Sequence, residues 1–164
     1  MAASGGAVKA FVITVSDRCF AGTMSDRSGP ALTDLLEEAG LPVKGHAIVP
    51  DNRGQIIDAL LGAVADGYDL VVTNGGTGLG PRDVTPQATA ALLDYEVPGL
   101  AEAMRAAGAK KTPMAVLSRG LAGVRGRTLI LNLPGSVKGA TDSLKAVLPV
   151  LPHALRLLSG DTEH

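Results

Sequence analysis

The sequence is poor in aromatic residues, with no tryptophan, two tyrosines and two phenylalanines among 164 residues. Single-stranded nucleic acids stack their bases on aromatic side chains, and proteins that bind the phosphate backbone carry a clear excess of basic charge. The formal net charge here is −1. The scarcity of aromatic residues and the lack of a basic excess both argue against a nucleic-acid-binding protein. The scarcity of aromatic residues also requires a core built from aliphatic side chains.

Cysteine and histidine are also scarce. The single cysteine, Cys19, excludes an internal disulfide and any metal site built from several thiolates, and it is compatible with a reducing compartment. Three histidines, at positions 46, 153 and 164, have no ligand spacing and suggest no Ser-His-Asp set. Because no histidine adjoins Cys19, we interpret it as an ordinary thiol rather than a nucleophile.

Long hydrophobic runs are missing as well. The run FVITV at residues 11–15 is far too short for a signal-peptide core or a membrane span, so we expect a cytoplasmic protein. With 46% hydrophobic and 19% charged residues, the chain has the length and composition of one globular domain. We predict a flexible N-terminus at 1–9, a single domain at 10–159 and a tail at 160–164.

Strand-like and helix-like segments alternate in the first half of the chain. Apolar, β-branched runs predict strands at 9–15, 41–49 and 70–72. Between them, apolar residues recur with helical spacing, first from a predicted N-cap at Ser28 to Gly40 and then up to Gly67. This order predicts a mostly parallel α/β sheet covered by helices on both faces.

The second half departs from this alternation. Residues 87–108 predict two short helices divided at Val97-Pro98, and residues 114–121 and 127–133 flank a glycine-containing turn. We interpret that pair as a hairpin that adds an antiparallel piece to the sheet. A last helix follows Ser136, bent or divided by Pro149 and Pro152.

A glycine-rich loop follows the third predicted strand. The sequence TNGGTGLG at 73–80 contains four glycines in eight residues. It fits neither the Walker pattern nor the dinucleotide fingerprint, because Gly80 is followed by Pro81-Arg82. A plain turn seldom needs so many glycines, whereas a bare backbone can direct its N–H groups at phosphate oxygens. We therefore favour anion binding at this loop.

Polar residues follow the other strand ends on the same predicted edge: Ser16, Asp17, Arg18 and Asp51, with Asp83 just past the glycine loop. Taken singly, Asp51 and Asp83 are each explained as helix-capping or turn residues. Taken together beside a phosphate cradle, the two carboxylates favour a Mg²⁺ site.

A second helix start and several cations complete the candidate site. Ser136 in LPGS is explained as a helix N-cap, yet Gly135 and Ser136 can also offer N–H groups to an anion. Five cations lie near the predicted turns, and we expect only one or two of them to contact a substrate. They are Arg18, Arg27, Arg82, Arg119 and Lys138.

These motifs occur in an order that resembles a known family. TVSDRCFAG, DRSGP, VPDN, DLVVTNGGTGLGPRDVTP, LSRG and LILNLPGSVKGA, between residues 10 and 158, resemble the molybdopterin-binding Mog/MoaB family and the G domain of gephyrin. The resemblance implies a three-layer α/β/α fold, a homotrimer and adenylylation of molybdopterin by Mg-ATP with release of pyrophosphate.

The resemblance also implies roles for particular residues. Asp51 and Asp83 correspond to Mg²⁺-binding and catalytic carboxylates. The segment Thr73, Asn74, Gly75, Gly76, Thr77 and Gly78 would bind the phosphate of the ligand, and Pro134, Gly135 and Ser136 would line the pterin side.

Two other functions stay open at this level. The first is a carrier or scaffold that binds molybdopterin without chemistry and passes it to a molybdate-insertion protein. The second is an unrelated hydrolase that cleaves ATP without a pterin. The alanine-rich segment after Gly99 can pack against another subunit or against the sheet.

Overall fold

Six strands form one mixed sheet in the order β2-β1-β3-β6-β5-β4. β1 (Ala10–Val15) pairs in parallel with β2 (Val43–Val49) and β3 (Leu70–Asn74), and β3 pairs in parallel with β6 (Thr128–Leu133). β5 (Ala122–Arg125) is antiparallel to β6 and to β4 (Tyr95–Glu96). The predicted mostly parallel sheet with an antiparallel addition is confirmed.

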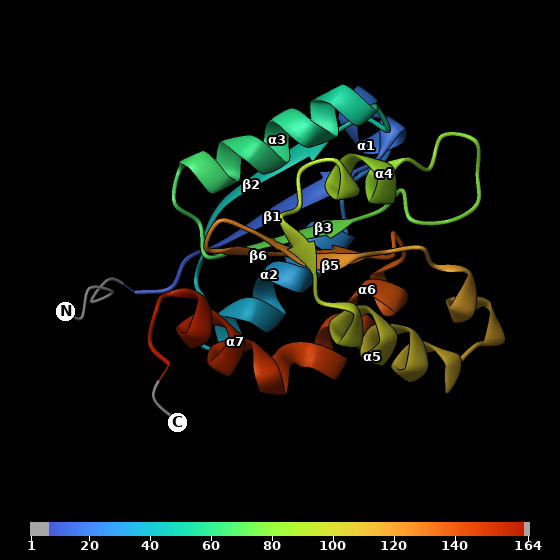
Figure 1. The fold of residues 1–164 in the computed structure, drawn as a ribbon. Helices are drawn as coiled ribbons and strands as arrows, with labels where there is room; N and C mark the ends of the chain where they lie inside the picture. The colour runs from blue at the N-terminus through green and yellow to red at the C-terminus, as the bar shows by residue number, and fades with distance from the viewer. Residues whose placement is uncertain (1–6, 163–164) are drawn as a thin grey trace.

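Helices cover both faces of this sheet (Figure 1). One face carries α3 (Arg53–Ala65) and α4 (Thr85–Ala90), and the other carries four helices. These are α2 (Ser28–Glu38), α5 (Pro98–Ala109), α6 (Val137–Val147) and α7 (Leu151–Leu158). The result is the three-layer α/β/α arrangement expected from the sequence. The short 3₁₀ helix η3 (Leu148–Val150) divides α6 from α7 at the predicted prolines.

The core consists of two aliphatic clusters, one on each side of the sheet. Along β3, Leu70 and Val72 belong to the cluster under α2, α5, α6 and α7, whereas Val71 between them belongs to the cluster under α3 and α4. Side chains alternate between the faces of a strand, so a strand covered on both sides is apolar at every position. This explains the continuous apolar run that predicted the strand.

The computed structural model describes residues 7–162. Residues 1–6 of the predicted flexible N-terminus and residues 163–164 of the predicted tail lie outside this described part. No helix between residues 7 and 162 combines the length and the apolar character needed to cross a bilayer.

The predicted hairpin is correct in its second arm and wrong in its first. Residues 114–121 are not a strand, because Pro113–Leu117 form the 3₁₀ helix η2 and the true partner of β6 is β5. Thr112 starts η2 by accepting a hydrogen bond from the N–H of Met114. The apolar side chains of Met114, Val116 and Leu117 are exposed, so their β-like pattern does not mark a buried strand.

Two local assignments also need correction. The segment after β1 is not all loop, since it contains the short helix α1 (Asp17–Ala21) capped by Ser16. Ser28 is not an N-cap: it is the first residue of α2, and the carboxylate of Asp26 accepts the hydrogen bond from the N–H of Gly29 at 2.9 Å.

Candidate active site

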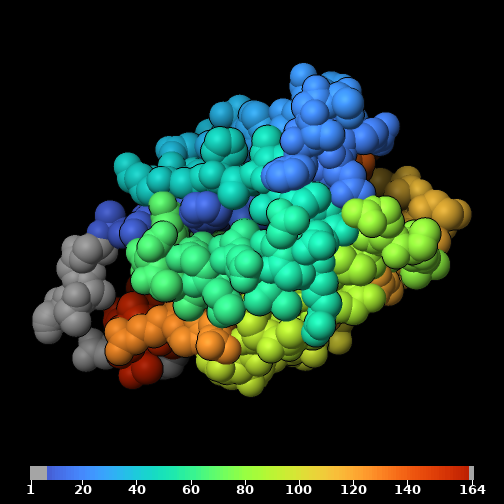
Figure 2. Space-filling model, turned by 90° about the horizontal axis from the view of Figure 1, so that it is seen from above, coloured from blue at the N-terminus to red at the C-terminus, as the bar shows by residue number. Residues whose placement is uncertain are grey.

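Four loops meet at the carboxyl edge of the parallel strands. Hydrogen bonds join them in pairs: the N–H of Ser16 donates to the carbonyl of Val49 at 2.9 Å, and the N–H of Gly75 donates to the carbonyl of Leu133 at 3.0 Å. Figures 1 and 2 both place α1 and the loop after β3 at the end of α3 where that helix begins. Parallel pairing therefore gathers the residues that follow β1, β2, β3 and β6.

In the glycine loop, every carbonyl from residue 75 to residue 78 is bound by the protein. These oxygens accept, in order, from Thr85 Oγ1 (2.9 Å), Thr85 N (3.1 Å), Arg119 N (2.8 Å) and Arg119 Nε (2.8 Å). Within residues 7–162, the N–H groups of residues 76–79 have no acceptor. The N–H and C=O of a planar peptide point in opposite directions, so four consecutive donors face away from the groups that hold the loop. Such a row of N–H groups is an anion-binding nest.

Two of these glycines cannot be replaced without distortion. Gly75 has φ 101° and Gly76 has φ 69°, a conformation that residues with a Cβ rarely adopt. An added Cβ on Gly75 would collide with the carbonyl oxygen of Val15, and one on Gly76 would collide with the hydroxyl of Thr85. Glycine therefore lets the loop lie directly against the end of β1.

Asp51 is joined to Asp17 and to Arg82. The N–H of Asp17 donates to Asp51 Oδ2 at 3.0 Å, and the N–H of Asp51 donates to Asp17 Oδ1 at 2.9 Å. Arg82 forms an ion pair with Asp17 at 2.6 Å and also donates to the carbonyl of Asp51 at 3.1 Å. Three loops are thereby tied together around one carboxylate.

The surroundings of Asp51 disfavour its negative charge. Burial is the main cause that raises the pKa of Asp51, and the charges of Asp17 and Asp83 raise it further. The N–H of Asp17 and the charge of Arg82 oppose this effect. For Asp17 itself, the hydrogen bond from Arg82 lowers the pKa. A cation bound beside Asp51 would therefore favour its ionised form.

Asp83 lies half-buried beside the same loop, where an added Cβ on Gly78 would lie 2.9 Å from its Oδ2. Its Oδ2 accepts a hydrogen bond from the N–H of Gly80 at 3.0 Å, whereas within residues 7–162 its Oδ1 has no donor, like the Oδ1 of Asp51. Neither acid is an N-cap, because Asn52 caps α3 and α4 begins without a side-chain cap. The helix-cap explanation is therefore wrong for both, whereas Asp83 does act as a turn residue, because its N–H donates to the carbonyl of Gly80 at 3.0 Å.

The donor set fits magnesium. Two carboxylates with one open oxygen each are hard ligands, and Mg²⁺ is usually held by one or two carboxylates together with oxygens of the substrate. No group of three or more His, Cys, Asp or Glu able to hold a metal occurs within residues 7–162. A complete protein cage for a transition metal is accordingly absent from the described chain.

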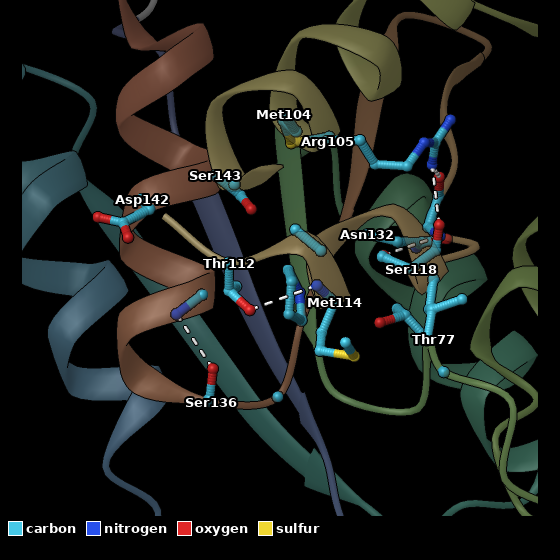
Figure 3. Close-up of a pocket in the computed structure, with 18 of the residues that line it drawn as sticks. Thr77, Met104, Arg105, Thr112, Met114, Ser118, Asn132, Ser136, Asp142 and Ser143 are labelled. Atoms are coloured by element: carbon cyan, nitrogen blue, oxygen red, sulfur yellow. Dashed lines mark hydrogen bonds between the residues drawn. The ribbon is translucent and has the colours of Figure 1, made fainter. Parts of the chain in front are cut away.

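A cavity of about 600 Å³ opens beside the glycine loop (Figure 3). Its lining combines Gly76, Thr77, Gly78 and Asp83 with Pro134, Gly135 and Ser136, and it continues along α5 and η2. Figure 3 shows Thr77 and Asn132 across the cavity from Ser136 and Asp142. The described lining does not include Ser16, Asp17, Arg18 or Asp51, so these four predicted residues lie outside this cavity.

Two predicted ligand-binding residues have their side chains engaged in the sheet. Thr73 Oγ1 accepts from Asn132 Nδ2 at 3.1 Å, and Asn74 Nδ2 donates to Thr14 Oγ1 at 3.1 Å, all within the buried interior. Ser136 caps α6 by accepting from the N–H of Gly139 at 3.0 Å. The side chains of these three residues are therefore already engaged, whereas the backbone N–H groups of residues 76–79, Gly135 and Ser136 have no acceptor within residues 7–162.

Sequence reasoning missed how the DRSGP segment supports the site. Asp26 accepts from Thr14 Oγ1 at 2.8 Å, and Ser28 Oγ donates to the carbonyl of Gly135 at 2.8 Å. The start of α2 is thus fastened to β1 and to the turn after β6. An Asp three residues before a glycine is a local capping signal, but no local signal indicates the distant partners Thr14 and Gly135.

A family model described as a probable molybdopterin binding domain matches residues 11–153. The molybdopterin adenylyltransferase of Helicobacter pylori strain J99 is 42% identical over 154 residues, covering 92% of this chain and 87% of that protein. The molybdopterin biosynthesis enzyme MoaB of Thermus thermophilus has a crystal structure with a TM-score of 0.88 and 57% identity, covering 93% of this chain and 97% of that one.

Some relatives are much longer. The molybdenum cofactor synthesis protein cinnamon of Drosophila melanogaster is 44% identical, and the match covers 92% of this chain but 25% of that protein. The chain also spans 48% of the length of a bifunctional molybdenum cofactor biosynthesis protein of Synechococcus elongatus, at 41% identity. The same domain therefore occurs alone and as part of larger proteins.

Proposed function

The chain belongs to the family of probable molybdopterin binding domains, and from this membership we propose that it acts in molybdenum cofactor biosynthesis as a molybdopterin adenylyltransferase. Relatives that carry this name are about as long as the chain itself. The proposed reaction joins molybdopterin to the adenylyl group of ATP and releases pyrophosphate.

One observation carries the proposal: the N–H groups of residues 76–79 have no acceptor within residues 7–162, and both acids adjoin this loop. An added Cβ on Gly76 would lie 3.1 Å from Asp51 Oδ1, and one on Gly78 would lie 2.9 Å from Asp83 Oδ2. Transfer of a nucleotidyl group needs positioning and neutralisation of charge more than it needs a protein nucleophile. A nest of donors supplies both for a phosphate group. A plain phosphate carrier would not require the two acids.

The bonds that change can be stated. An oxygen of the terminal phosphate of molybdopterin forms a bond to the α-phosphorus of ATP, and the bond from that phosphorus to the oxygen bridging to the β-phosphate breaks. The donors of residues 76–79 would hold the phosphate that attacks. Asp51 and Asp83 would hold Mg²⁺, which when bound offsets the charge of the triphosphate. No covalent intermediate with the protein is needed.

We assign the two substrates to the two sides of the glycine loop. The cavity lined by Pro134 and Gly135 and by the apolar side chain of Met104 fits a flat pterin. The segment Ser16 to Arg18, beside Asp51, would face the nucleotide. A homotrimer and a molybdate-insertion partner stay predictions from the resemblance, and a cytoplasmic location stays a prediction from the sequence.

The test is an assay of purified protein with molybdopterin, ATP and Mg²⁺, followed by detection of adenylylated molybdopterin and pyrophosphate. We expect both products in equal amounts, and none without molybdopterin. Binding of molybdopterin without product would identify a carrier, and cleavage of ATP in the absence of molybdopterin would identify a hydrolase. Either result contradicts the proposal.

A further inference from the structure

Arg119 holds the glycine loop from behind. It lies just after η2, and its backbone N–H donates to the carbonyl of Thr77 at 2.8 Å. Its guanidinium donates from Nε to the carbonyl of Gly78 at 2.8 Å and from Nη2 to the carbonyl of Asp83 at 2.8 Å. A longer contact of 3.3 Å joins Nη1 to the side chain of Gln87 on α4.

These bonds determine where the loop donors point. Fixing the carbonyl of Thr77 fixes the N–H of Gly78, and fixing the carbonyl of Gly78 fixes the N–H of Leu79, because each pair shares one planar peptide. Both N–H groups then point away from Arg119. Without the guanidinium, the carbonyl of Gly78 loses its hydrogen bond and the peptide that joins Gly78 to Leu79 can rotate, because glycine tolerates most backbone conformations. The hydrogen bond to the carbonyl of Thr77 comes from the main chain of Arg119 and stays in any side-chain variant.

The same guanidinium also fixes the backbone of Asp83. The planar guanidinium therefore bridges the carbonyls of Gly78 and Asp83, and it fixes the backbone of Asp83 relative to the N–H groups of the glycine loop. Arg119 is half-buried, and none of its recorded contacts goes to an acidic side chain. Its role in the described structure is to orient main-chain carbonyls rather than to form an ion pair.

We propose that Arg119 is a positioning residue for adenylyl transfer, whose guanidinium aligns the donor of residue 79 with Asp83 and does not touch the substrate. The inference rests on the proposed function. It requires an arginine, because a planar guanidinium bridges two carbonyls at fixed geometry whereas a lysine ammonium on a flexible stem does not.

The test compares Arg119→Lys with the wild-type protein and with Arg125→Gln. Arg125 on β5 also donates to a main-chain carbonyl, that of Leu92 at 3.0 Å, and it does not line the cavity. Arg119→Lys keeps the positive charge, so any change in activity or affinity comes from the loss of the planar guanidinium and its fixed hydrogen bonds. The measurements are kcat and KM for both substrates, the thermal unfolding midpoint, and the calorimetric affinity for inorganic pyrophosphate with Mg²⁺ removed by chelator.

For Arg119→Lys we expect kcat to fall and pyrophosphate affinity to weaken, each by ~10- to 100-fold, as for other residues that orient a site from behind it. KM for molybdopterin should rise, because the same donors would hold its phosphate, whereas KM for ATP should change little, and added methylguanidinium should restore part of kcat in Arg119→Ala. Arg125→Gln should keep the wild-type kcat and affinity.

Two outcomes overturn the inference. One is a wild-type kcat and pyrophosphate affinity in Arg119→Lys, and the other is equal losses in Arg119→Lys and Arg125→Gln that follow a common loss of thermal stability. An inactive wild-type protein counts against the proposed function instead, and in that case the pyrophosphate titration still decides whether Arg119 orients the nest.

Discussion

Asp17 and Asp51 exchange two hydrogen bonds, in which the backbone N–H of each residue donates to the carboxylate of the other at 3.0 and 2.9 Å. The exchange fastens the loop after β1 to the loop after β2, and Arg82 adds the loop after β3 through its ion pair with Asp17. Asp51 Oδ1 takes no part in this exchange and lies near Gly76, since a Cβ added to Gly76 would be 3.1 Å from it. The proposed metal ligand is therefore fixed from three directions.

This arrangement predicts a specific pH dependence. Burial raises the pKa of Asp51 above 3.8, and the charge of Asp17 adds to the effect. Mg²⁺ binds the ionised carboxylate, so its affinity should weaken as the pH falls through this raised pKa. In Asp17→Asn the repulsive charge is gone and the loss should occur at lower pH. Calorimetric titration of Mg²⁺ with ATP present, across the acid range, measures this shift.

An exposed acid on α3 provides the control: Asp58→Asn should leave the pH profile of the wild type unchanged. A profile of Asp17→Asn that does not move, or that moves to higher pH, contradicts the account.

The pH dependence of the free energy of unfolding runs in the direction opposite to that of Mg²⁺ binding. The folded protein holds the proton of Asp51 more tightly than the unfolded chain, so this contribution to stability is present below pH 3.8 and is lost as the pH rises through the raised pKa.

Gly76→Ala tests the need for a bare backbone in the nest. The left-handed conformation of Gly76 costs a residue with a Cβ about 1–2 kcal/mol, and the collision with Thr85 adds to that. We expect lower stability in urea unfolding together with weaker binding of molybdopterin. Gly62→Ala in the exposed middle of α3, where a Cβ meets nothing within 4 Å, should instead stabilise by about 0.5–1 kcal/mol. Equal changes in stability and in molybdopterin affinity for Gly76→Ala and Gly62→Ala would contradict a role of Gly76 in the site.

Ser136 has two possible roles that its variants separate. Ser136→Asn and Ser136→Asp both keep a side chain that caps α6, so both should unfold like the wild type, whereas Ser136→Ala should lose about 1 kcal/mol. If an anion binds near this turn, the carboxylate of Ser136→Asp should repel it while Ser136→Asn does not. Thermal unfolding and molybdopterin titration measure the two roles. Equal affinity in the Asn and Asp variants would leave Ser136 as a cap alone.

The main elements of the fold could be predicted because their signals are local. Buried strands such as Leu70–Asn74 are short apolar runs, and Asn52 and Ser136 are capping residues directly before their helices. The two-residue strand β4 is too short to carry a periodic pattern. Residues 114–117 were misassigned because exposure, which the pattern does not encode, distinguishes a surface 3₁₀ helix from a strand.

The site could be predicted only in part for a related reason. Asp83 lies within ten residues of the loop glycines, and Asp51 follows β2, which is parallel to β3 with only β1 between them, so parallel topology is enough to bring them together. The bonds from Arg119 to Gly78 and Asp83 join residues that are 41 and 36 positions apart. They depend on the path of η2, which the sequence did not predict.

Asp83→Asn tests the central claim that the acids beside the nest carry the transfer. Asparagine can still accept the hydrogen bond from the N–H of Gly80, so the loop should keep its shape while the negative charge is lost. The measurement is single-turnover transfer of the labelled adenylyl group from ATP to molybdopterin, with molybdopterin affinity measured in parallel. We predict labelled molybdopterin from the wild type and, for Asp83→Asn, unchanged affinity with transfer slower by ~10²-fold or more. Transfer at the wild-type rate by Asp83→Asn, or a wild type that binds molybdopterin and leaves it unlabelled, would contradict this account.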